Sequence, residues 1–152
     1  MMTAVALESG YWSSLGEGVG AIILYALIGL VLMLVGFYAI DLTTPGHLRG
    51  LVVEGKPNAI IVTAAGMISM AFIVVLAILA VGSGGKLSEG LIAALVYGLV
   101  GIIAQVISVR VLEKALGIDI GAALHADTYT TEVLVVAAAH FALGLVVAFA
   151  IL

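Results

Sequence analysis

Apolar residues fill four long stretches of the chain, and polar residues collect in the segments between them. The stretches without a charged residue are 18–40, 57–85, 90–109 and 133–152, which are 23, 29, 20 and 20 residues long. An α-helix rises about 1.5 Å per residue, so roughly 20 residues cross a hydrocarbon core about 30 Å thick. The pattern predicts an all-α membrane protein with four transmembrane helices.

The composition excludes several other classes of protein. Only 9% of the residues are charged and 64% are hydrophobic, whereas about a quarter of the residues of a soluble domain are charged. No Lys or Arg precedes the first apolar stretch, so it is not expected to be a secretory signal. The formal charge of −4 argues against a nucleic-acid partner, and the chain has no cysteine. The partner that the composition implies is the lipid bilayer.

The five basic residues predict the orientation in the membrane. Four of them lie in or beside the first and third loops, and one lies in the second: Arg49, Lys56, Arg110 and Lys114 against Lys86. Because cytoplasmic loops are enriched in Lys and Arg, loops 42–56 and 113–130 are expected in the cytoplasm. Both termini are then extracytoplasmic, and residues 1–17 form an extracytoplasmic lead.

The two halves of the chain resemble each other at an offset of 72 residues. Tyr25 matches Tyr97, Gly29 matches Gly101, and Asp41 falls on Glu113. This indicates two helical hairpins, 18–82 and 88–152, related as parallel repeats. Their spans are expected at about 18–41 and 57–82, then 89–112 and 131–152. The alternative is chance similarity between apolar segments.

Small residues recur at helical spacing along three of the predicted helices. Ala94, Gly98, Gly101, Gln105 and Ser108 are spaced 4, 3, 4 and 3 residues apart, and similar stripes pass through Gly36 and Gly144. In lipid, small residues allow helices to approach closely. We expect helix packing at Gly29, Gly36, Gly98, Gly101, Ser108 and Gly144, with a pore lining as the alternative. Four helices cannot bury all these stripes, so a homo-oligomer, a dimer or larger, is also expected.

The polar loops are interpreted as turns between membrane helices. Thr44 and Pro45 predict the N-cap and first residue of a short amphipathic surface helix that ends at Gly55. In the third loop, Gly117 is expected to end the third helix. Asp127 or Thr128 is expected to cap the fourth helix, with Glu132 in its first turn.

A few polar residues remain inside or at the edge of the apolar stretches. They are candidates for a polar cavity or for hydrogen bonds between helices: Asp41, Asn58, Gln105, Arg110 and His140. Polar groups at this depth usually face the bundle interior. Asp41 is expected to have a base nearby, and Arg110 can extend to the interface. His140 is expected either to form a neutral hydrogen bond across the bundle or to titrate functionally.

The sequence provides no positive case for an enzyme. Asp119, His125 and Asp127 share a loop, but their spacing matches no metal-ligand signature. No nucleophile–base pair, phosphate-binding loop or carboxylate dyad is apparent. We therefore expect no catalytic residue, no metal and no cofactor.

Three segments resemble the domain-of-unknown-function 350 family of small bacterial membrane proteins. They are YALIGLVLMLVGFYAIDLTTPG, EGKPNAIIVTAAGMISMA and GLVGIIAQVISVRVL, and the matching positions are Asp41, Thr44, Pro45, Asn58 and Gln105. Lys56 and Pro57 separate a glycine and an asparagine that are usually adjacent in the family. The resemblance covers roughly residues 20 to 152. It implies a four-span, two-repeat protein of the bacterial inner membrane with no established activity.

Three hypotheses for function follow from these residues. The first is a non-enzymatic membrane component that acts by self-assembly or by binding a membrane protein partner. The second is a small channel or transporter with a polar cavity in its cytoplasmic half. The third, an enzyme acting on lipid or quinone, rests only on His140 and the acidic residues of the loops.

Overall fold

A computed structural model describes residues 10–80 and 86–152, and every regular element within them is a helix. The helices are α1 (Tyr11–Thr43), α2 (Leu48–Val53), α3 (Pro57–Ala80), α4 (Leu87–Leu116), α5 (Ile120–His125) and α6 (Glu132–Ala150). Helices α1, α3, α4 and α6 are long and apolar enough to cross a membrane. The four helices expected from the sequence are thus present.

The long helices extend beyond the charge-free stretches that predicted them. Helix α1 begins at Tyr11, inside the expected extracytoplasmic lead, of which residues 1–9 lie outside the described residues. Helix α4 continues past Arg110 and Glu113 and ends before Gly117, whose φ of 66° forms the expected left-handed cap. Charged residues favour the ends of membrane helices because they reach the polar interface there. The absence of charge therefore marks the membrane core and not the helix ends.

The two predicted N-caps are wrong. Helix α2 begins at Leu48 with His47 as its N-cap, not at Pro45 after Thr44. The Thr44 hydroxyl is occupied elsewhere, since it donates to the Ile40 carbonyl at 2.7 Å. Helix α6 begins after Thr131, and Asp127 instead pairs with Lys56. Glu132 does lie in the first turn of α6, as expected.

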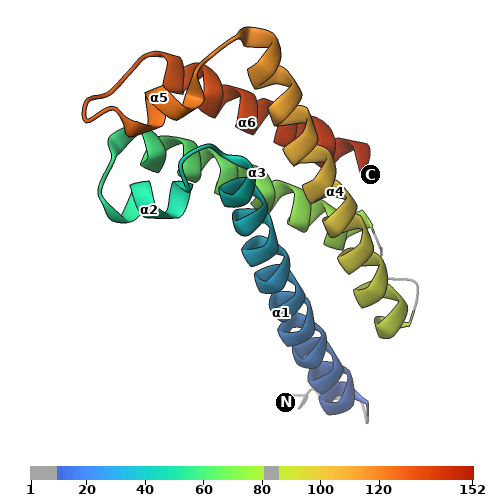
Figure 1. Cartoon of the computed structure of the whole chain (residues 1–152). Helices are drawn as coiled ribbons and strands as arrows, with labels where there is room; N and C mark the ends of the chain where they lie inside the picture. Colours follow the sequence, from blue (N-terminus) through green and yellow to red (C-terminus); the bar gives the residue numbers. More distant parts are fainter. Residues whose placement is uncertain (1–9, 81–85) are drawn as a thin grey trace, which may run out of the picture.

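Helix α3 forms the centre of the bundle. It packs most extensively against α6 and also contacts α1, α2, α4 and α5. Helix α1 packs on α3 and α4 near its C-terminal end, where its buried residues are Leu32, Gly36, Ile40 and Asp41. Figure 1 shows the N-terminal part of α1 extending away from the other helices. The two short helices, α2 and α5, lie at one end of the molecule.

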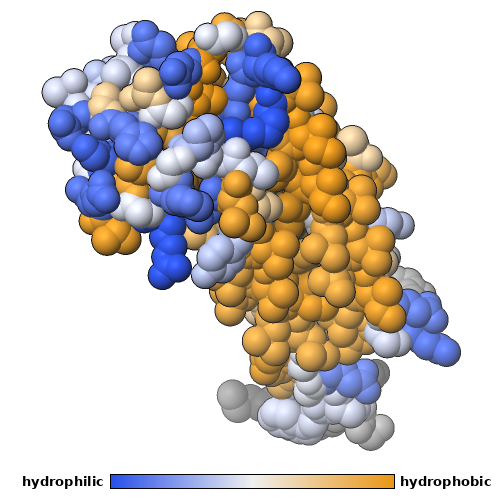
Figure 2. Space-filling model, in the orientation of Figure 1, coloured by the Kyte–Doolittle hydropathy of each residue, from blue (hydrophilic) through white to orange (hydrophobic). Residues whose placement is uncertain are grey.

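The surface divides into a polar end and an apolar body. In Figure 2, hydrophilic residues gather at the end that holds α2 and α5, and hydrophobic residues cover the long helices. Large apolar side chains on every long helix are exposed, including Ile22, Leu34, Ile92 and Val146. A soluble protein rarely exposes so continuous an apolar surface, whereas lipid is a favourable environment for it.

Glycines allow close contact at five places in the bundle, and Gly66 faces Ile40 at one of them. Gly36 faces Met70, Gly98 faces Leu32, Gly101 faces Ile73, and Gly144 faces Ser69. A Cβ atom added at Gly98 would lie 2.5 Å from Leu32 Cδ1, and one at Gly101 would lie 2.5 Å from Ile73 Cγ2. Real Cβ atoms essentially never approach so closely. Of the other predicted packing residues, Gly29 approaches Val74 and Ser108 is half-buried.

Candidate functional site

The five polar residues predicted as a cluster occupy three separate places in the structure. Gln105 and His140 lie together in the bundle interior, Asn58 lies under the second polar loop, and Asp41 and Arg110 lie near the first polar loop. The hydrogen bonds of these groups use different partners. The described contacts therefore place these residues in three separate sets of hydrogen bonds.

Gln105 links three long helices inside the bundle. Its side-chain amide donates to Ser69 Oγ of α3 at 2.9 Å and to the His140 carbonyl of α6 at 2.8 Å. All three residues are 1% exposed or less. The other amide atom, Oε1, is buried without a partner among the described residues. Because lipid offers no competing water, these bonds hold the relative positions of α3, α4 and α6.

The His140 imidazole bonds within its own helix. Its Nδ1 lies 3.0 Å from the Val136 carbonyl, and the ring is almost fully buried. A carbonyl oxygen can only accept a hydrogen bond, so Nδ1 carries the proton in this arrangement. The hydrogen bond across the bundle is made by the His140 backbone carbonyl and not by its ring.

Asn58, in the first turn of α3, forms hydrogen bonds with α5 and with the loop between α5 and α6. Its Nδ2 donates to the Ala123 carbonyl at 2.7 Å and to the Thr128 carbonyl at 3.0 Å, and its Oδ1 accepts from Thr130 N at 3.2 Å. The residue is fully buried. Its partners lie 65 to 72 residues away in the sequence. No local pattern could have predicted them.

Among the described residues, Asp41 forms no ion pair with a basic side chain, although the sequence suggested a nearby base. Its Oδ1 accepts from the backbone N–H of Arg49 at 2.7 Å, in the first turn of α2. Arg110 instead forms an ion pair with Glu113, one turn along the same helix, at 2.6 Å. A second guanidinium nitrogen of Arg110 donates to Thr44 Oγ1 at 3.2 Å. Arg110 thus connects the end of α4 to the first polar loop.

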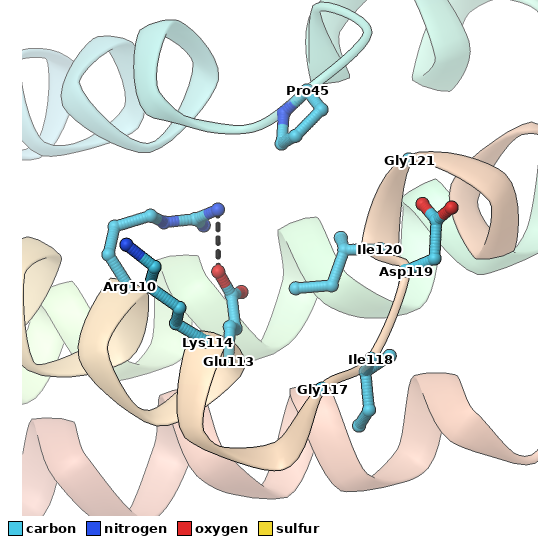
Figure 3. Close-up of a pocket in the computed structure, with 9 residues that line it drawn as sticks. All are labelled: Pro45, Arg110, Glu113, Lys114, Gly117, Ile118, Asp119, Ile120 and Gly121. Carbon is cyan, nitrogen blue, oxygen red and sulfur yellow. Dashed lines mark ion pairs between the residues drawn. The ribbon is translucent and has the colours of Figure 1, made fainter.

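The Arg110–Glu113 pair borders an open pocket of about 390 Å³ at the polar end of α4. Glu113 and Lys114 line it from α4, and the segment from Gly117 to Gly121 and Pro45 complete its walls. Figure 3 shows the Lys114 ammonium on the same side as the Arg110 side chain, with the Asp119 carboxylate beyond Ile120. Sequence reasoning missed this pocket, because Glu113 was interpreted as the repeat counterpart of Asp41 and Lys114 as a charge that sets the orientation in the membrane.

The loop acids and His125 have separate structural roles. Asp119 accepts from Ala122 N at 3.0 Å and caps α5, and His125 Nδ1 lies 2.8 Å from the Gly121 carbonyl. Asp127 accepts a hydrogen bond from Lys56, which holds the pKa of Asp127 below its ordinary value and raises that of Lys56. In the residues that the structure describes, no three His, Cys, Asp or Glu side chains gather as metal ligands.

Four apolar helices, an apolar belt and a polar end define a multi-pass α-helical membrane protein. The chain belongs to the family described as Domain of Unknown Function (DUF350), whose model matches residues 14–151. This agrees with the resemblance found in the sequence. No solved structure matches the chain.

Curated relatives are transmembrane proteins of mycobacteria. The chain is 37% identical over 130 residues to a UPF0719 transmembrane protein of Mycobacterium tuberculosis (strain CDC 1551 / Oshkosh), covering 81% of this chain and 84% of the relative. A UPF0719 transmembrane protein of Mycobacterium bovis (strain ATCC BAA-935 / AF2122/97) matches equally well. One of Mycolicibacterium paratuberculosis (strain ATCC BAA-968 / K-10) is 44% identical over 88 residues, 57% of each chain.

Proposed function

We propose that this protein is a non-enzymatic component of the bacterial inner membrane that acts by assembling with further copies of itself. The observation that carries the proposal is the weak packing of α1 in its own bundle. In the most apolar 18-residue window of α1, 6% of the residues are buried, against 33% to 39% in the other three long helices. Much of α1 is therefore available to a neighbouring chain.

The N-terminal part of α1 has features of a helix–helix interface. Gly16 and Gly20 lie one turn apart on the same face, and a Cβ atom added at either would meet no described atom within 4 Å. Facing lipid, glycine offers neither side-chain contact nor good helix propensity. Facing a second helix, the small-xxx-small spacing lets two backbones approach closely. We therefore assign this face to self-association.

The polar residues support a structural role over a catalytic one. Gln105 and Asn58 use their amides to hold helices and a loop together. The Asp41 carboxylate accepts a hydrogen bond from the backbone N–H of Arg49 at the start of α2. These groups form hydrogen bonds within the fold, which favours a structural role in an assembling protein over a catalytic role.

The two halves are proposed to be parallel repeats. Residues Leu48–Val53 of α2 and Ile120–His125 of α5 differ by 72 at both ends, the offset seen in the sequence. Asp41 and Glu113, which also differ by 72, are both buried. The shared polar end of α2 and α5 supports placing loops 42–56 and 113–130 on one side of the membrane. The Lys and Arg residues in and beside these loops favour the cytoplasmic side, with both termini outside.

Changing the exposed glycine face is expected to weaken self-association. Gly16→Leu combined with Gly20→Leu should raise the dissociation constant about tenfold, because bulky side chains keep two backbones apart. The chain has no cysteine, so Leu152→Cys provides a single labelling site. Energy transfer between donor- and acceptor-labelled copies in lipid vesicles measures the association.

Gly18→Leu is the matched control for that experiment. Gly18 lies on the same helix with no described atom within 4 Å of an added Cβ, but about 200° around the axis from Gly16. It should leave energy transfer unchanged. Equal energy transfer in the double variant and the wild type would show that copies do not associate through this face.

A channel or transporter is the second candidate function. Two side-chain oxygens in the bundle, Gln105 Oε1 and Thr63 Oγ1, are buried without a partner among the described residues. Water or a permeant molecule would satisfy them, since a buried unpaired polar group is costly. This is the observation that favours a polar path.

Flux measurements separate the two functions. If the protein is only an assembling component, proteoliposomes should show ion and solute flux no higher than empty liposomes. If it conducts, wild-type flux should exceed that background and fall in Gln105→Leu and His140→Leu. Wild-type flux that disappears in these two variants would replace the assembly proposal with the channel.

A further inference from the structure

We propose that the pocket at the end of α4 binds a phosphate ester of a phospholipid headgroup. The argument does not depend on self-assembly and rests on the charges, the depth and the unsatisfied atoms of this pocket. Its charged residues are Arg110, Glu113, Lys114 and Asp119, and its volume is about 390 Å³.

The charges that converge on the pocket leave one cation without a partner. Arg110 is paired with Glu113. The Asp119 carboxylate caps α5 and lies beyond Ile120 as seen from both cations (Figure 3). Among the described residues, Lys114 has no ion-pair partner. The Arg110–Lys114 side of the pocket therefore carries a net positive charge and suits an anion.

The pocket lies at the level along the membrane normal where lipid phosphates are expected. Arg110 and Lys114 occupy the last turns of a helix that is long enough to cross the membrane. Figure 2 shows apolar residues over the long helices below the polar end. Lys and Arg at such a position meet the headgroup layer, where basic residues attract anionic lipid. Ile118, Ile120 and Pro45 provide apolar walls beside the charges.

Two buried atoms of residues that line the pocket lack a hydrogen-bond partner among the described residues. Glu113 is 6% exposed, yet its Oε1 has no hydrogen-bond partner among the described residues, and neither does Arg110 Nε. The ion pair uses only Glu113 Oε2 and Arg110 Nη1. Because Oε1 is covered by protein atoms, a headgroup hydroxyl or ammonium beside the phosphate would donate to it only after the Arg110–Glu113 pair rotates toward the pocket. Phosphatidylglycerol has this chemistry.

Lipid binding to the purified full-length protein tests the proposal. Native mass spectrometry in detergent would titrate dioleoyl-phosphatidylglycerol against dioleoylglycerol, which lacks the phosphate. We expect the phospholipid to bind at least tenfold more tightly. Lys114→Gln, an exposed substitution, should weaken phosphatidylglycerol binding about fivefold, the effect of losing one interfacial cation.

Arg49→Gln is the matched control, because Arg49 is an exposed cation at the same end of the molecule but outside the pocket. It should leave binding unchanged. Equal weakening by both variants, no weakening by Lys114→Gln, or equal binding of dioleoylglycerol would overturn the proposal. Glycerol 1-phosphate then identifies the source of the phosphate. If glycerol 1-phosphate displaces phosphatidylglycerol at a similar concentration, the ligand of the pocket is a soluble phosphate ester. If it does not displace the lipid, the ligand is the phospholipid.

Discussion

Gly144→Ala is expected to destabilise the bundle by about 3 kcal/mol, a large effect for a single methyl group. The added Cβ would overlap Ser69 Oγ and would lie 2.7 Å from Ser69 Cβ and 3.1 Å from Ser69 Cα. Because one of these contacts is to the backbone, a change of rotamer cannot relieve it, and α3 and α6 must separate. Titration with sodium dodecyl sulfate in mixed micelles, followed by circular dichroism, measures the free energy of unfolding.

The glycine control is Gly50→Ala in α2, where an added Cβ meets nothing within 4 Å. It should leave stability unchanged or raise it by up to about 1 kcal/mol, since Ala favours a helix more than Gly does. The compensating pair is Ser69→Gly with Gly144→Ala, which removes Ser69 Oγ and Cβ from the contact. Because Ser69→Gly also removes the acceptor of the Gln105 amide, the comparison is with Ser69→Gly alone. Gly144→Ala should cost less in that background than in the wild type, since only the 3.1 Å contact with the Cα of residue 69 remains. A Gly144→Ala protein as stable as the wild type would mean that α3 and α6 are not packed at this point.

The sequence predicted the long helices well because the membrane imposes a strong constraint on them. Four charge-free stretches of 20 or more residues correspond to α1, α3, α4 and α6. Lipid tolerates few other structures, so length and apolarity suffice. The helix ends were harder to predict. Arg110, Glu113 and Lys114 interrupt the apolar stretch but continue the helix, because helical geometry does not require an apolar residue.

The caps failed for a different reason. Thr44 is a good N-cap by residue type, but its hydroxyl bonds the Ile40 carbonyl and accepts from Arg110. Tertiary partners at a distance of 66 residues therefore override a local preference. His47, with its φ of 54°, takes the N-cap position, which no sequence rule would assign to it.

The polar residues were predicted to be important, but their grouping was not predictable. A single sequence places Gln105 and His140 at similar depth, and the structure brings them together. A single sequence gives no distance between Asn58 and residues of the second half. The spacing of Arg110 and Glu113 on one helix allows them to pair, but it does not exclude a pair between Arg110 and Asp41. Long-range contacts depend on how each helix is rotated about its axis. The stripes of small residues indicate which face of a helix packs, but not which residues of a neighbouring helix meet that face.

Asn58→Ala is expected to lower the free energy of unfolding by about 3 kcal/mol and to release the loop between α5 and α6. The substitution removes three hydrogen bonds and leaves the Ala123 and Thr128 carbonyls and the Thr130 N–H without their partner. An unsatisfied buried group costs about 1–3 kcal/mol, and access of water to the opened loop limits the total. Titration with sodium dodecyl sulfate measures the loss. Hydrogen exchange should show faster exchange at residues 123–130.

Thr63→Val on the same helix is the matched control. Its Oγ1 is buried without a described partner, so replacing the hydroxyl by a methyl group should be neutral or slightly stabilising. Asn58→Asp tests whether the two hydrogen bonds donated by Asn58 Nδ2 provide most of the stabilisation. At neutral pH its carboxylate would face the Ala123 and Thr128 carbonyls, and the variant should be at least as unstable as Asn58→Ala. If Asn58→Ala changed neither stability nor exchange, the loop would be held by contacts other than this amide.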